Sequence, residues 1–223
     1  MPLHVSPAPA PALRTVVTAL GSPSAIRAAS APAALRTAQG PLRPELPLPT
    51  YEMARVAPRS ADHAGTAESG PRTRLTGWRF LLRDEGATGE SPGAAAWAGT
   101  AEAVPTADGW AFGQFRQGPY VLSTVRAVRQ AEALSAPYQP RLLSVPELYM
   151  LTLWLHRDVA ADPAEGVPDP ADLLIPLAPA PPGIAPHKTH RVDALLPLLV
   201  RRLVTAPGRA PGATAASLLR TSA

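Results

Sequence analysis

The sequence predicts an α+β fold: a single domain in which a mainly antiparallel sheet of about five to six strands packs against a pair of helices. Two observations indicate this fold, namely short apolar segments bounded by turn residues and amphipathic segments with helical spacing. A third observation, an N-terminal stretch of different composition, predicts an arm that precedes the domain. We expect three regions: a Pro/Ala/Arg-rich arm at 1–45, low in complexity or forming short helices; the α+β domain at 46–205; and a flexible tail at 206–223.

The predicted arm differs from the rest of the chain in charge and in pattern. Its first 44 residues contain four arginines and no acidic residue. A helical apolar stripe, ended by Gly21–Pro23, marks the candidate binding residues Leu13, Val16, Val17 and Leu20. A helix this short is marginal on its own and needs a surface to lie on. We expect a disordered arm or short helices packed on the same chain; the alternatives are a peptide that docks on a partner protein and, from the Arg-rich, acid-free composition, a cleavable transit peptide.

The basic charge of the chain does not predict nucleic-acid binding. The net charge is +4, and 20 of the 21 basic residues are arginine while asparagine is absent, a composition typical of a GC-rich genome. Residues 1–75 carry eight arginines and four acidic residues, whereas residues 76–223 carry 13 basic and 13 acidic residues. The domain is therefore nearly neutral and lacks the basic face, interleaved with aromatic residues, that a nucleic-acid surface needs. We expect no nucleic acid as a partner.

Several kinds of site are excluded by residue type. The chain has no cysteine, which excludes disulfides, thiolate nucleophiles and cysteine-ligated metals. His187 and His190 have a spacing that can bring two imidazoles to one ion, but no further ligand accompanies them. We therefore expect neither a metal nor a cofactor. The longest apolar stretch, 145–156, is too short and too interrupted to span a membrane, so we expect a cytoplasmic protein without membrane contact.

The strands are predicted from apolar segments that lie between turn residues. A hairpin is expected at 97–116, around the turn signal Asp108–Gly109. The segment 148–156 has apolar residues in both alternating sets, which predicts a central strand covered on both faces. Pro176 places the strand at 173–177 at a sheet edge or a bulge. Other strands are expected at 50–56, after a proline-rich connector at 41–49, and at 78–83 and 141–145.

Two helices are predicted within the domain. The first, at 123–134, has Ser123 as its expected N-cap. Its apolar stripe consists of Leu122, Val125, Val128, Ala131 and Leu134. The second, at 192–204, has Asp193 near its start, the favourable end of the helix dipole for an acid, and Pro197 predicts a kink or a late start.

The function expected from these features is that of a non-catalytic protein-binding or assembly module in an intracellular complex. No convincing catalytic set accompanies the neutral domain, and the arm or a sheet edge is the expected docking element. The expected partner is another protein or a second copy of the chain, as in a homo-oligomer.

The alternative function is that of a small hydrolase or ligand-binding enzyme. His156 ends the central strand and would act as a base with a nearby carboxylate, Asp158 or Asp172. Trp110 and Trp154 would then line the ligand pocket. A histidine at the end of a strand is more often held by a satisfied hydrogen bond, which is why we prefer the binding module.

Overall fold

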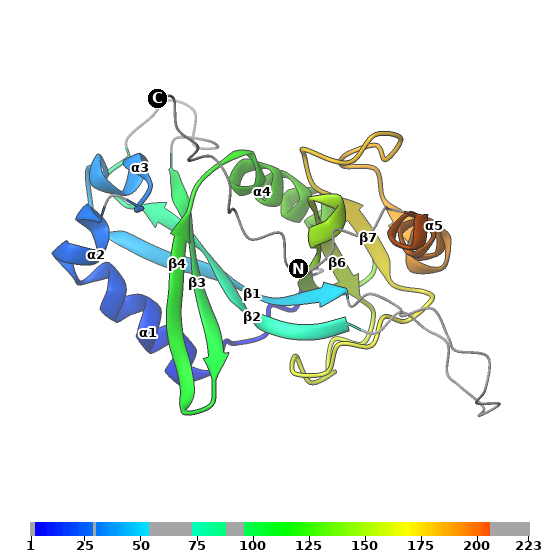
Figure 1. The fold of residues 1–223 in the computed structure, drawn as a ribbon, viewed down its shortest axis with the longest axis horizontal. Coiled ribbons are helices and arrows are strands. Elements are labelled where there is room, and N and C mark those ends of the chain that lie inside the picture. Colours follow the sequence, from blue (N-terminus) through cyan, green and yellow to red (C-terminus); the bar gives the residue numbers. More distant parts are fainter. Residues whose placement is uncertain (1–2, 29, 54–72, 88–95, 206–223) are drawn as a thin grey trace, which may run out of the picture.

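The computed structural model describes residues 3–28, 30–53, 73–87 and 96–205, and these form an α+β fold (Figure 1). A mostly antiparallel sheet of eight strands packs against five α-helices, so the predicted class is confirmed and the expected number of strands was too low. The shortest strand, His190–Arg191, has no apolar residue and gives no signal in the sequence. The elements are α1 (Ala10–Leu20), α2 (Pro23–Arg27), α3 (Ala33–Arg36), β1 (Leu42–Met53), β2 (Thr73–Asp84), β3 (Trp97–Thr106), β4 (Gly109–Arg116), α4 (Pro119–Glu132), β5 (Gln139–Val145), the 3-10 helix η1 (Pro146–Leu148), β6 (Met150–His156), β7 (Leu173–Pro176), β8 (His190–Arg191) and α5 (Val192–Thr205).

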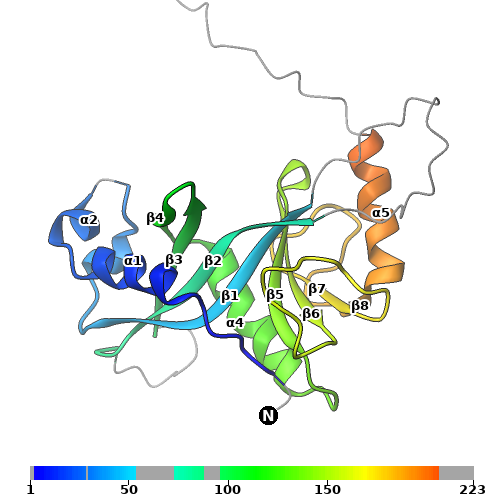
Figure 2. The ribbon, with the colours of Figure 1, turned by 90° about the horizontal axis from the view of Figure 1, so that it is seen from below.

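The sheet has two halves with the same chain order. Its strands lie in the order β4-β3-β2-β1-β5-β6-β7-β8. The N-terminal half contains α1–α3 followed by β1–β4, and the C-terminal half contains α4 followed by β5–β8 and then α5. The halves are joined by the parallel pairing of β1 with β5 at Thr50–Glu52. Figure 2 shows α1–α3 and α5 at opposite ends of the sheet.

The helices cover the two faces of the sheet unequally. In β2, Phe80 and Leu82 pack with α1, whereas Leu81 between them packs with Val121 and Val125 of α4. Because successive side chains of a strand point to opposite faces, α1 and α4 lie on opposite faces. The C-terminal half is covered twice, by α4 on one face and by α5 on the other. In the N-terminal half, only the face opposite α4 has a helical layer of its own, α1–α3.

The central strand predicted at 148–156 is confirmed as β6, which begins after η1. All of its residues are buried. Leu151, Leu153 and Leu155 pack on the side of α4, while Met150 and Trp154 pack on the side of α5. The two apolar sets seen in the sequence therefore contact two separate helices. The hairpin predicted at 97–116 is also confirmed, as β3 and β4.

The proline-rich segment predicted to be a connector at 41–49 is instead part of β1, which was not foreseen. Pro44 and Pro49 pair with Leu82 and Trp78 of β2. Only Thr50–Glu52 of β1 pairs with β5, so the earlier part of β1 has a neighbour on one side alone. A strand with one free edge tolerates proline, because the missing N–H leaves no ladder bond unmade.

The helix predicted in the N-terminal arm packs on its own sheet. Ala12, Val16 and Ala19 of α1 are buried in a core shared with β2, β3 and β4. Leu13 and Val17 of the predicted binding set are exposed, and Leu20 is partly buried. The buried stripe is thus displaced around the helix from the predicted one, because small alanines allow a closer approach to the strands than the leucines do.

The two domain helices occur where they were predicted, with one difference at the start of α4. The helix begins at Pro119, after Gly118, and Ser123 lies inside it rather than at its N-cap. Leu122 of the predicted stripe is exposed, whereas Val121 is buried. Within the described residues, no helix is both long and apolar enough to cross a membrane. The predicted tail at 206–223 lies outside the described residues.

Candidate binding groove

A groove lies beside α4, on the face of the N-terminal half that α1–α3 leave open. It consists of two adjoining cavities of about 530 and 340 Å³. The residues that line both cavities are Arg79, Arg116, Ser144 and Pro146. These shared residues make the two cavities one continuous groove across β1, β2, β3 and β5.

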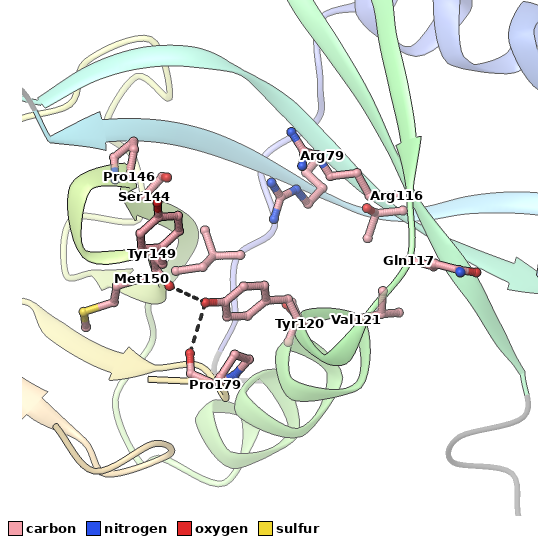
Figure 3. Close-up of a pocket in the computed structure, with 13 residues that line it drawn as sticks. Arg79, Arg116, Gln117, Tyr120, Val121, Ser144, Pro146, Tyr149, Met150 and Pro179 are labelled. Atoms are coloured by element: carbon pink, nitrogen blue, oxygen red, sulfur yellow. Dashed lines mark hydrogen bonds between the residues drawn. The ribbon is translucent and has the colours of Figure 1, made fainter. Parts of the chain in front are cut away.

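The walls of the groove come from both halves of the sheet (Figure 3). Arg79 and Arg116 extend from β2 and the end of β4 on one side, and Tyr149 lies on the other. Tyr120 reaches between them from the first turn of α4. Tyr149 ends η1 in a left-handed conformation, with φ 49°. This conformation turns the ring outward at the rim, where Tyr149 is 81 % exposed.

An ion network forms the charged wall of the groove. Oε1 of Glu102 accepts hydrogen bonds from Nε and Nη2 of Arg79, at 3.0 and 2.6 Å. The same oxygen lies 3.1 Å from Nε of Arg116. Oε2 of Glu102 accepts a hydrogen bond from Gln114 at 3.2 Å. Two guanidinium groups thus share one carboxylate, and the network keeps a net positive charge.

Tyr120 fixes α4 to the opposite rim. Its hydroxyl lies 2.6 Å from the carbonyl oxygen of Tyr149 and 3.0 Å from that of Pro179, so it donates toward both. Partial burial raises the pKa of Tyr120, which keeps the hydroxyl protonated as a donor. The contact holds three separate parts of the chain, α4, the η1–β6 turn and the segment after β7, around one end of the groove.

A serine–histidine contact lies behind this end of the groove. Oγ of Ser123 accepts a hydrogen bond from the N–H of Ala178 at 2.7 Å and lies 3.1 Å from Nε2 of His187. Burial, together with Arg126, lowers the pKa of His187 and favours the neutral ring. Nδ1 of His187 is buried without a hydrogen-bond partner among the described residues. The pair therefore lacks the acid that orients the imidazole of a nucleophile–base pair, and Ser123 lines neither cavity of the groove.

The residues of the predicted enzyme site lie on the other face of the sheet. Oδ2 of Asp172 accepts hydrogen bonds from Nε1 of Trp154 and from His156, each at 2.7 Å. Although burial opposes it, the bonds from His156, the Arg157 and Asp169 backbone and Trp154 together lower the pKa of Asp172. His156 and Asp172 line neither cavity of the groove.

The other predicted residues are not brought to this contact. Asp158 accepts the N–H of Ala160 in an exposed turn rather than approaching His156. Trp154 is buried in the core under α5, whereas Trp110 packs at the core under α1. The two predicted pocket tryptophans thus belong to different halves of the sheet.

The buried Arg141, which lies near Asp172, was not predicted from the sequence. It donates to Oε1 of Gln139 at 2.5 Å and to the Glu165 carbonyl at 2.6 Å. Its guanidinium stacks over the rings of Tyr51 and Trp154, at 5.5 and 5.0 Å. Burial lowers the pKa of Arg141 and raises the pKa of Tyr51 to about 12. A single arginine in an apolar strand, followed by the acidic loop at 158–172, is the only signal that pointed to it.

The two histidines with metal-like spacing are separated by the sheet. His187 contacts Ser123 of α4. His190 pairs with Leu174, whose side chain packs in the core under α5. Among the described residues, no group of three potential ligands is found.

Comparisons of this chain with protein families, with curated proteins and with solved structures give no match. The fold and the site define an α+β protein with an open groove on one half of its sheet.

Proposed function

We propose that this protein is a non-catalytic protein-binding module and that the groove receives an extended segment of a partner protein. The observation that carries the proposal is the open groove itself, built from aromatic, apolar and oppositely charged side chains. None of its described lining residues is a histidine, so Ser144 and Tyr120 have no neighbouring imidazole base within it.

The composition of the groove supports binding to protein. Protein interfaces are enriched in tyrosine, methionine and arginine, and tyrosine and arginine dominate their binding energy. Tyrosine and arginine both occur here, as Tyr120, Tyr149, Arg79 and Arg116. A large aromatic ring that its own chain leaves exposed, as with Tyr149, is available to a partner.

The proposal is tested by a photo-crosslinking amino acid placed at Tyr149 in cells that naturally express the chain. The matched control is the same amino acid at Val167, which is equally exposed at 79 % but lies in the acidic loop of the other half. We expect a discrete protein adduct from position 149 and not from position 167. Identical adducts from both positions, or none from 149, would contradict the proposal.

A second docking surface is the outer face of α1, where Leu13 and Val17 stand one turn apart and exposed. These are two of the residues predicted to bind a partner. Replacing both by serine leaves the buried Val16 in place, so the helix keeps its packing. Loss of the position-149 adduct in this variant would show that the partner also contacts α1; an unchanged adduct would confine binding to the groove.

The enzyme alternative depends on the hydrogen bond between His156 and Asp172. A carboxylate that holds an imidazole in this way is found behind catalytic histidines. The test is hydrolysis of a panel of p-nitrophenyl esters by the wild type and by His156→Gln. An activity lost in the variant would favour this alternative, and equal rates would remove it.

A further inference from the structure

The charges are distributed unevenly along the groove. Among the described residues that line the larger cavity, next to α4, the only charged ones are Arg79 and Arg116. The smaller cavity adds Glu52 and Glu102 to the same two arginines. Glu102 is engaged by both guanidinium groups, whereas Glu52 has no ion pair with a described residue. The groove is therefore positive at its centre, and Glu52 places a carboxylate at its other end, opposite Arg74 of β2.

The two arginines keep donors that Glu102 does not use. Arg79 donates hydrogen bonds to Glu102 through Nε and Nη2, whereas Nε of Arg116 forms an ion pair with the same carboxylate. Within the described residues, Nη1 of Arg79 and both Nη groups of Arg116 have no hydrogen-bond partner. Arg116 is the more exposed of the two, with 53 % of its side chain accessible. Free guanidinium N–H groups are suited to a second carboxylate, which they bind by short charge-assisted hydrogen bonds.

An apolar surface lies next to these donors. Val121 and Leu151 line the larger cavity together with the ring of Tyr149. Val121 and Leu151 are buried against the sheet, so their exposed edges form a fixed surface rather than a mobile one. A large apolar side chain placed there would be covered while its neighbour reaches the arginines.

We propose, on the basis of the protein-binding function above, that the groove recognises an internal acidic side chain next to an aromatic or large aliphatic residue. The carboxylate bridges Arg79 and Arg116, and the apolar residue packs between Tyr149 and Val121. The segment continues into the smaller cavity, where Glu52 disfavours a further acid and favours a neutral or basic residue. A chain that ended in its carboxylate at the arginines would leave that 340 Å³ cavity unfilled, which is why we assign an internal side chain.

The proposal is tested by selecting binders for the full chain from a random peptide library displayed on phage. The displayed peptides are fused at their C-termini, so an acid that they share is a side chain. We expect the selected peptides to share an Asp or Glu adjacent to an aromatic or large aliphatic residue. As synthetic peptides with amidated C-termini, they should lose about 10-fold or more in affinity when the acid is replaced by its amide.

Variants of the protein locate the binding. Arg116→Gln should weaken the peptides by about 10-fold, and Arg79→Gln combined with Arg116→Gln by more. The matched control is Arg14→Gln with Arg27→Gln, which removes the same charge from exposed helical positions on the opposite face and should not change affinity. Thermal unfolding of each variant verifies the fold, and the single Arg116→Gln variant keeps the Arg79–Glu102 pair intact.

The outcomes separate this inference from the function on which it rests. Peptides that need Tyr149 but share no acid, or that bind Arg116→Gln as well as the wild type, would overturn the inference and leave the binding function standing. Binding only by peptides with a free C-terminal carboxylate would also overturn it. If the selection yields no peptide that depends on Tyr149 or Arg116, both fail. Concentration-dependent light scattering that is abolished by Arg116→Gln would show a second copy of the chain as the occupant instead.

Discussion

The two halves of the sheet share a chain order, a helical segment followed by four antiparallel strands. They differ in the surroundings of their charged side chains, which are buried in one half and face an open groove in the other. In the C-terminal half, covered by α4 and α5, Arg141 and Asp172 are fully buried and each is surrounded by hydrogen-bond partners. In the N-terminal half, Arg79 and Arg116 line the groove and share one carboxylate, and some of their N–H groups have no partner among the described residues. Where helices cover both faces of the sheet, a polar side chain must find its hydrogen-bond partners within the fold, because burial makes an unmet hydrogen bond costly. Where one face is open, such a side chain remains available to a ligand.

Removal of the buried Arg141 is expected to have the largest effect on stability. Arg141→Ala should lower the free energy of unfolding by about 3 kcal/mol or more, since it leaves Gln139 and the Glu165 carbonyl without their donor. Urea unfolding followed by circular dichroism measures this loss. Arg116→Ala is the matched control. An equal loss of stability there would show that the arginines of the two halves do not differ in their contribution to the fold.

A smaller loss is expected from Asp172→Asn, with an effect on pH dependence. The amide replaces two acceptor oxygens by one and should cost about 1–3 kcal/mol at pH 7. The pKa of Asp172 is lowered in the fold, so its contribution is complete above the unfolded value of about 3.9 and is lost as the pH falls below it. Urea unfolding between pH 3 and pH 7 should therefore show a shallower acid dependence in the variant than in the wild type. Parallel curves would show that the carboxylate is not the group responsible.

A smaller dependence of stability on pH, between neutral and mildly acidic values, is expected from His187. Its pKa is lowered in the fold, so the stability it confers is complete above the unfolded value of about 6.5 and decreases as the pH falls below it. His190 has a pKa lowered by burial and by Lys188 and contributes in the same direction. The melting temperature of the wild type should therefore fall more between pH 7.5 and 5.5 than that of His187→Gln, whose amide can still contact Ser123. Equal decreases in the two proteins would assign the effect to His190 or to other groups.

The smallest effect on stability is expected at the rim of the groove. Tyr149→Ser should change the free energy of unfolding by less than about 0.5 kcal/mol, because the ring is exposed and only its carbonyl accepts the Tyr120 hydrogen bond. The same variant should lose the partner binding that we propose for the groove. A large loss of stability would show that the ring supports the fold, and the two halves would then differ less than we infer.

Much of the fold was predictable because its signals are local. The alternation of Leu153 and Trp154 in one apolar strand predicted two covered faces, and the turn at Asp108–Gly109 predicted the β3–β4 hairpin. The helical spacing from Val125 to Ala131 predicted α4. The contact of His156 with a carboxylate was also anticipated, with Asp172 rather than Asp158 as its partner. The first three of these depend on residues close together in the sequence or on the period of one element, whereas the His156 contact joins β6 to the loop that follows it.

The groove could not be predicted, because its lining residues are brought together from separate elements. Arg79, Glu102 and Arg116 lie on three strands and look like ordinary solvent-facing charges in the sequence. Tyr149 was read as part of an apolar strand, and only its left-handed backbone after η1 turns it outward. The partners of Arg141 in the loop at 158–172 are mainly backbone carbonyls, which carry no residue-type signal.

The amino-acid sequence by itself determined the class of this fold, the two-sided burial of β6 and the positions of α4 and α5, since these follow from periodicity within single elements. Only the tertiary structure decided that β1 joins the two halves through a short parallel pairing, that α1 buries its alanines, and that one face beside α4 stays open. The physical reason is that coverage of a sheet face depends on which distant segments pack together. The spacing of apolar residues along a single strand does not specify those segments.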